Sequence, residues 1–124
     1  MNNRPVNLNF LTIRFPLAAI VSILHRISGI FLFLLIPLLL WMLQESLASE
    51  TRWQLMHTLF RLPWVKAVTW VMLAGLIYHW IAGIRHLLLD MHVGETKTAS
   101  RVSAFIVLSL SALLIIAVGY RLWL

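Results

Sequence analysis

The sequence contains no cysteine and has few charged residues. Charged side chains make up only 11% of the 124 residues, against about 25% in ordinary globular proteins. A soluble fold of this size would lack the charges needed to cover its surface, so we exclude a soluble enzyme. The absence of cysteine also excludes disulfides, thiolate metal sites, iron–sulfur ligation and covalent haem attachment. Any redox cofactor must therefore be held through histidine or methionine.

Acidic residues are scarcer than basic ones. Four Asp and Glu against ten Lys and Arg give a net charge of +6, a balance that can indicate nucleic-acid binding. The basic residues are scattered, however, with no run of three, and they lie at the ends of apolar segments. This arrangement is typical of membrane proteins, whose flanking cations contact lipid headgroups. We therefore expect membrane lipid as a partner and no nucleic acid.

Long apolar stretches dominate what is present. Hydrophobic residues make up 61% of the chain, and the mean hydropathy is +0.91. Three stretches of 18 or 19 residues carry no charge: Ile27–Gln44, Ala67–Ile84 and Val102–Tyr120. Helices of that length cover about 27–29 Å, close to a hydrocarbon core of roughly 30 Å. The sequence predicts an all-α integral membrane protein, a single transmembrane domain over 1–124 with helices at about 17–44, 63–90 and 101–123.

The first predicted helix could be mistaken for a cleaved signal peptide. Ser46–Ala48 faintly resembles a processing site, but the apolar run is long and about 25 residues precede it, which favours a retained helix. The segment 49–61 after it carries Trp53, Met56 and Phe60 at helical spacing. This spacing predicts a short amphipathic helix lying on the membrane surface.

The distribution of basic residues predicts the orientation. Six would lie on the side of the N-terminus: Arg4, Arg14, Arg26, Arg85, Lys97 and Arg101. Four would lie on the other side: Arg52, Arg61, Lys66 and Arg121. Because basic residues accumulate on the cytoplasmic side, we expect a cytoplasmic N-terminus and a periplasmic C-terminus.

Polar residues share one face of the predicted helix 63–90. They are Gly75, His79, Gly83, His86 and Asp90, at offsets of three or four residues that keep them aligned. His79 lies about 16 Å along the axis from Asp90, near the bilayer centre, where ionisable groups are costly and usually functional. The flanking glycines predict a shallow groove that admits a porphyrin edge to His79. Alternatively, the glycines serve close helix packing and His79 hydrogen-bonds a neighbouring helix.

A second polar face lies on the predicted helix 17–44. It carries Ser22, His25, Arg26 and Gly29. If the two helices run antiparallel, this face comes level with three residues of the other helix: Arg85, His86 and Asp90. Such a cationic cluster suits haem propionates, and the Ser22 hydroxyl beside Arg26 suits a quinone carbonyl. Alternatively, the arginines extend to lipid phosphate, as we expect for Arg14, Arg85 and Arg101.

These residues form two motifs that resemble a known family. The motifs are Ser22-Ile23-Leu24-His25-Arg26-Ile27-Ser28-Gly29 and His79-x-x-x-Gly83-Ile84-Arg85-His86-x-x-x-Asp90, preceded by Arg4-Pro5-Val6. Together they resemble the cytochrome b membrane-anchor subunit of bacterial succinate dehydrogenase. The motifs cover about residues 4–90 and are specific only as a pair. Phe10 and Leu89 depart mildly from the pattern, and neither touches the expected chemistry.

The resemblance implies cofactors, partners and residue roles. The subunit would form a helical anchor bundle with a second anchor subunit, sharing one b-type haem with it, and attach a flavoprotein and an iron–sulfur subunit to the bacterial inner membrane. His79 matches the axial ligand of the haem iron, and His25, Arg26 and His86 match residues near the propionates. Ser22 and Arg26 match the ubiquinone site.

The resemblance implies no activity for the chain alone. The chain lacks thiols and a flavin-binding glycine motif, so electrons from succinate would reach ubiquinone through the partner subunits. Two alternatives stay open. The chain could be the anchor of a fumarate reductase, or a purely structural membrane assembly protein that binds no haem.

Overall fold

The computed structural model describes residues 15–124, and the described part is built from four helices. They are α1 (Leu17–Ala48), α2 (Glu50–Leu59), α3 (Pro63–Asp90) and α4 (Lys97–Trp123). The expectations that concern Arg4, Phe10 and Arg14 lie outside the described residues. No strand occurs between residues 15 and 124, and the all-α prediction is confirmed.

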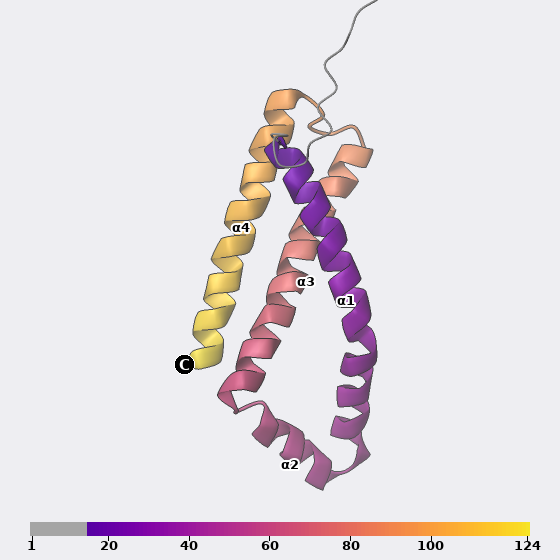
Figure 1. Cartoon of the computed structure of the whole chain (residues 1–124), viewed down its shortest axis with the longest axis vertical. Coiled ribbons are helices and arrows are strands. Elements are labelled where there is room, and N and C mark those ends of the chain that lie inside the picture. The colour runs from indigo at the N-terminus through magenta and orange to yellow at the C-terminus, as the bar shows by residue number, and fades with distance from the viewer. Residues whose placement is uncertain (1–14) are drawn as a thin grey trace, which may run out of the picture.

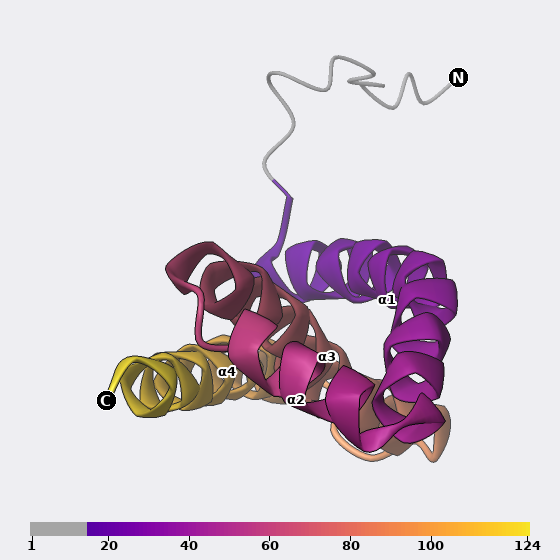
Figure 2. The ribbon, with the colours of Figure 1, turned by 90° about the horizontal axis from the view of Figure 1, so that it is seen from below.

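Three of the helices are long and apolar enough to cross a membrane. The mean hydropathy of their most apolar windows is 2.2 in α1, 1.6 in α3 and 2.6 in α4. They alternate in direction, so that the start of α1, the end of α3 and the start of α4 lie at one end of the molecule (Figure 1). Seen from the opposite end, α3 lies between α1 and α4 (Figure 2). The chain is therefore a multi-pass membrane protein, with α1 and α3 antiparallel as expected.

Local sequence signals set the helix ends. α1 begins directly after Pro16, whose φ is −64°, and it continues to Ala48, four residues beyond the predicted end. α4 begins at Lys97, four residues before the predicted start, because the Thr96 hydroxyl accepts the Ala99 amide at 3.2 Å and caps the helix. Pro37 lies within α1, where its ring removes one backbone hydrogen bond without ending the helix.

The segment predicted as a surface helix forms α2. Ser49 caps it by accepting the Arg52 amide at 3.2 Å, and an ion pair between Arg52 and Glu45 joins it to the end of α1. α2 crosses the end of the bundle that holds the C-terminus of α1 and the start of α3 (Figure 2). Met56 is its buried residue, while Trp53 is half exposed.

The chain reverses sharply between α3 and α4. Gly94 has a φ of +83° and His92 a φ of 61°, a region that glycine adopts without steric cost. The His92 ring contacts the Glu95 carboxylate at 2.7 Å. This turn brings the first residues of α4 beside the last turns of α3.

The buried core lies where the three long helices meet. It consists of small side chains: Val21 from α1, Ala82 from α3, and Ala104 and Val107 from α4. Small residues let helices approach closely in a membrane, where packing replaces the hydrophobic effect between helices. Most large apolar side chains face outward instead, among them Phe33 and Trp80, which are 70% and 72% exposed. These outward residues form the surface available to lipid and to other chains.

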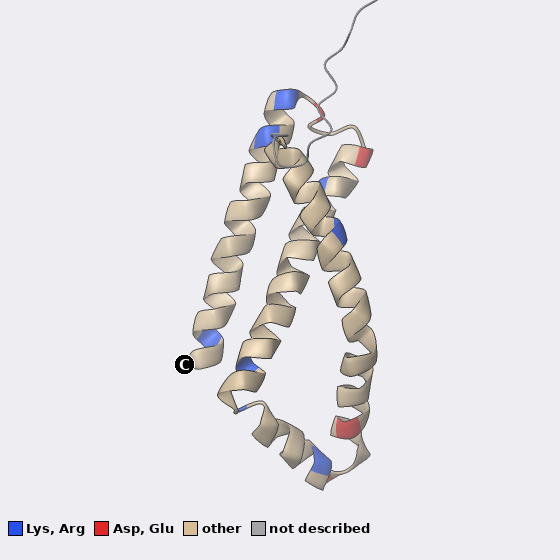
Figure 3. Cartoon of the chain, viewed as in Figure 1, with Lys and Arg blue, Asp and Glu red and all other residues tan. Residues whose placement is uncertain are grey.

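Charge is distributed as a membrane protein requires. Most basic and acidic residues lie at the two ends of the bundle, and the central turns of the three long helices carry hardly any (Figure 3). A charge within the hydrocarbon region is costly. The charge pattern therefore agrees with the three predicted spans.

Arg85 departs from this pattern and from its predicted role. It does not extend to lipid phosphate; its side chain is only 5% exposed. Its guanidinium turns from α3 toward α4, where Nε donates to Ser103 Oγ at 3.0 Å. Nη2 lies 3.1 Å from Ser100 Oγ and 3.3 Å from the Ser100 carbonyl oxygen. The prediction that Arg85 contacts lipid is wrong, because α4 provides these acceptors on the side of α3 facing it.

The hydrogen bonds from Arg85 to Ser100 and Ser103 predict an effect on stability. Arg85→Ala leaves the acceptors of α4 unsatisfied and should lower the free energy of unfolding by about 2–4 kcal/mol. The measurement is the thermal unfolding of the purified membrane complex in mild detergent. Arg121→Ala, which removes an exposed charge on α4, should change the free energy of unfolding by no more than about 0.5 kcal/mol. Equal melting temperatures for the two variants would contradict a stabilising role of the Arg85 hydrogen bonds.

Candidate functional site

Three histidine rings form a stack between α1 and α3. The His25 ring, from α1, lies between two rings from α3. Its centroid is 4.3 Å from that of His79 and 4.6 Å from that of His86, with interplanar angles of 16° and 22°. The antiparallel arrangement predicts His25 level with His86, and the structure brings the His25 ring into contact with His79 as well. Arg85 and Asp90 do not join the stack, since Arg85 turns to α4 and Asp90 is exposed.

The stack depends on close approach of the two helices. A Cβ atom added at Gly29 would lie 3.1 Å from His79 Cε1, and one added at Gly83 would lie 3.3 Å from His25 Nε2. A Cβ at Gly75 would lie 3.0 Å from the Phe31 ring. Side chains of α1 therefore lie directly against both glycines of α3. The contacts agree with the packing alternative, and access of a porphyrin edge to His79 stays a prediction.

The His79 ring is held at one nitrogen. Its Nδ1 lies 3.0 Å from Ser28 Oγ and 3.2 Å from the carbonyl oxygen of His25. A carbonyl oxygen only accepts hydrogen bonds, so Nδ1 carries the proton in this arrangement. In a neutral imidazole the lone pair then lies on Nε2, the atom available to a metal ion.

His86 has a related arrangement but a different partner. Its Nδ1 lies 2.9 Å from the Ala82 carbonyl oxygen, which only accepts, and its Nε2 lies 3.2 Å from Ser22 Oγ. Nδ1 therefore donates, and Nε2 accepts the hydroxyl proton of Ser22. Ser22, a predicted site residue, is thus joined to the histidine stack.

His25 and Arg26 complete the predicted set. The Nε2 atom of His25 is buried and has no hydrogen-bond partner within the described part of the chain, and such atoms are rare in proteins. Arg26, one residue later on α1, has an exposed side chain. The structure therefore has a buried, unsatisfied imidazole nitrogen on the residue that directly precedes an exposed arginine in α1.

The site does not resemble a chelating metal centre. Among residues 15–124, no group of three or more His, Asp or Glu side chains is arranged to hold a metal ion. The stacked rings lie nearly parallel, so their nitrogens do not converge on one point. The donor set instead suits a metal that takes one imidazole from this chain, as a haem iron does when its other axial ligand comes from elsewhere.

Sequence reasoning missed two residues at this contact. Ser28 was part of the first motif, but it received no role; its offset of three from His25 was the available signal. The Tyr78 hydroxyl donates to the Val21 carbonyl oxygen at 2.9 Å and joins α3 to α1. Nothing in the sequence distinguishes Tyr78 from an interfacial aromatic residue.

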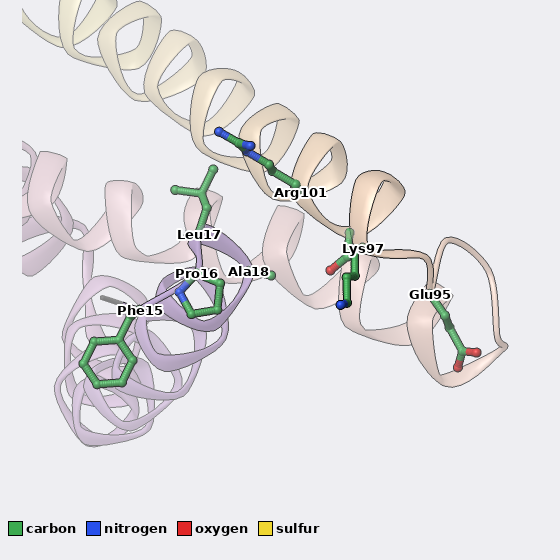
Figure 4. A pocket seen from close by; sticks show the side chains of 8 residues that line it. Phe15, Pro16, Leu17, Ala18, Glu95, Lys97 and Arg101 are labelled. Carbon is green, nitrogen blue, oxygen red and sulfur yellow. The ribbon is translucent and has the colours of Figure 1, made fainter. Parts of the chain in front are cut away.

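One cavity lies apart from the histidine stack. It has a volume of about 770 Å³ and lies between the starts of α1 and α4, with Lys97 and Arg101 projecting from α4 and Phe15 and Pro16 opposite (Figure 4). None of the predicted site residues lines it. Two smaller apolar cavities flank the α1–α3 contact: one of about 450 Å³ includes Gly29, and one of about 400 Å³ includes Ser28.

Comparison with known proteins agrees with the resemblance of the motifs. Residues 1–118 match the family described as succinate dehydrogenase/fumarate reductase transmembrane subunit. The chain is similar to the succinate dehydrogenase cytochrome b556 subunit of Coxiella burnetii, with 40% identity over 97% of each chain. It is also similar to that subunit of Paracoccus denitrificans, with 35% identity over 74% of this chain and 71% of the relative. For the Rickettsia felis subunit, identity is 28% over 91% of this chain and 88% of the relative.

The family match includes both motifs, the first three helices and most of α4. The chain therefore belongs to the succinate dehydrogenase/fumarate reductase transmembrane subunit family.

Proposed function

We propose that this chain is the membrane-anchor subunit of a succinate dehydrogenase, that it holds one b-type haem together with a second anchor subunit, and that it forms part of the ubiquinone-reduction site. The observation that carries the proposal is the hydrogen bonding of His79. Its Nδ1 faces two acceptor oxygens, so the lone pair of the neutral ring lies on Nε2, the atom that would bind iron. The relatives are named cytochrome b556 subunits, which agrees with a haem.

The residues at the stack suit a haem. His79 would provide one axial ligand, and the second anchor subunit would provide the other. A bound haem supplies a one-electron redox centre. His25, whose buried Nε2 lacks a partner, would gain one from a propionate oxygen, and His86 and the Arg26 guanidinium would contribute further to anion binding.

Ser22 and Arg26 suit a quinone carbonyl. The Ser22 hydroxyl donates to His86 Nε2, so a quinone carbonyl would compete with that nitrogen for the same proton. Arg26 lies one turn further along α1 and presents a permanent charge. The guanidinium would stabilise the negative charge that develops on the quinone oxygen during reduction. Protons would come mainly from partner subunits, because few other donors lie nearby.

The electron source must lie in other subunits. The chain contains no cysteine to ligate an iron–sulfur cluster. A flavoprotein subunit and an iron–sulfur subunit would therefore deliver electrons from succinate at the cytoplasmic face of the bacterial inner membrane. The start of α1 and the start of α4 would lie on that face, in line with the basic residues Lys97 and Arg101.

Replacement of the proposed ligand tests the haem. In the complex purified in mild detergent, His79→Ala should abolish the b-type band of the dithionite-reduced minus oxidised spectrum, because no other free imidazole takes its position. His57→Ala removes an exposed histidine of α2 and should leave the band unchanged. A full haem band in His79→Ala would overturn the axial assignment and leave a purely structural anchor as the alternative.

Replacement of Arg26 tests the quinone site. Arg26→Leu removes a charged donor and should lower kcat/KM for ubiquinone about tenfold or more. Electron transfer from succinate to a soluble dye should not change, because it needs only the partner subunits. Arg61→Leu, an exposed arginine beyond α2, is the matched control. Unchanged quinone kinetics in Arg26→Leu would contradict the assignment.

The close approach at Gly29 gives a steric test of the same site. Gly29→Ala places a Cβ 3.1 Å from His79 Cε1, so it should displace the ring and lower the haem content of the complex. Gly119→Ala places a Cβ 2.8 Å from Trp70 Nε1, at the α3–α4 contact. It should lower the melting temperature without loss of haem. Equal haem content in both variants would contradict the expectation that Gly29 makes room for the His79 ring at a haem site.

A further inference from the structure

Ser28 makes two hydrogen bonds at the histidine stack, and their directions are determined by chemistry. Its side chain is 9% exposed. Its Oγ lies 2.8 Å from the carbonyl oxygen of His25 and 3.0 Å from His79 Nδ1. The carbonyl only accepts, so the single hydroxyl proton of Ser28 is donated to it. Toward His79 the Ser28 oxygen can then only accept.

This arrangement leaves His79 with one stable neutral tautomer. Both oxygens facing Nδ1 are acceptors, since the His25 carbonyl also lies 3.2 Å from it. The tautomer with a lone pair on Nδ1 would direct that lone pair at two oxygens. A proton on Nδ1 satisfies both contacts and leaves the lone pair on Nε2.

We propose that Ser28 is a positioning residue for the haem ligand: its hydroxyl selects the His79 tautomer that presents Nε2 to iron and increases the donor strength of the imidazole. The inference rests on the proposed function of His79 as axial ligand. In general, the non-coordinating N–H of a metal-bound histidine is held by an acceptor that orients the ring and raises its basicity. Ser28 is the side chain of this chain that stands in that position.

No neighbouring side chain would replace the Ser28 hydroxyl. Ser28 lines the cavity of about 400 Å³ together with apolar residues and Tyr78. The Tyr78 hydroxyl already donates to the Val21 carbonyl. After loss of the Ser28 hydroxyl, His79 Nδ1 would keep only the longer contact to the His25 carbonyl. The imidazole would then be a weaker donor, and the oxidised iron, which carries more positive charge, would lose more stabilisation than the reduced iron.

The experiment is a redox titration of the haem in the complete purified complex, followed through the b-type band. Ser28→Ala should shift the midpoint potential to a more positive value and change the electron paramagnetic resonance signal of the oxidised haem. Ser28→Thr keeps a hydroxyl and should restore both toward wild type. Ser111→Ala is the matched control, because Ser111 is a buried serine of α4 whose Oγ has no hydrogen-bond partner among residues 15–124.

The outcomes separate this inference from the proposed function. A wild-type potential and spectrum in Ser28→Ala would overturn the role of Ser28, and so would an equal shift in Ser111→Ala. Loss of haem from Ser28→Ala, with retention in Ser28→Thr and Ser111→Ala, supports it. Loss from both Ser28 variants contradicts it, since a hydroxyl at this position would then not suffice. The axial role of His79 is tested separately, by the haem band of the His79→Ala complex.

Discussion

The contact between α1 and α3 is the constraint on which the rest of the site depends. Three imidazole rings stack within it, and nitrogens of His79 and His86 form hydrogen bonds with groups of the two helices. Rings can stack at this separation only when the backbones lie close together. Gly29 and Gly83 allow this, because a Cβ atom at either would lie 3.1–3.3 Å from an imidazole atom. The glycines and histidines thus form one packing unit.

Three polar side chains of α3 form hydrogen bonds with neighbouring helices. Such bonds matter because an unsatisfied polar group within hydrocarbon is costly in free energy. Trp70 Nε1 donates to the Ile115 carbonyl at 2.9 Å, Tyr78 donates to Val21, and Arg85 donates to Ser100 and Ser103. Each bond joins α3 to another helix. α3 therefore sets the relative positions of α1 and α4, and it also carries His79 and His86.

The distribution of burial suggests how the chain works in an assembly. The core is small and consists mainly of short side chains, whereas large apolar residues cover the outside. One polar atom at the stack, His25 Nε2, lacks a partner within the described residues. In the complex proposed above, this chain would contribute one haem ligand, one set of propionate contacts and one wall of the quinone site. In the proposed complex the second anchor subunit would complete each of them.

Periodicity and spacing in the sequence were sufficient for the spans and for bringing Ser22 and His25 level with His86. Helices of 18 or more apolar residues have one stable arrangement in a bilayer, and offsets of three and four place Ser22, His25 and Arg26, or His79 and His86, on one helix face. What periodicity could not determine is the direction in which each side chain turns. Arg85 lies one residue before His86 and faces α4, because Ser100 and Ser103 lie there. Ser28 and the glycines gain their roles only because α1 packs against α3 at one particular register. Direction and register depend on contacts between residues on different helices, 15 to 64 positions apart in the sequence, so only the tertiary structure decided them.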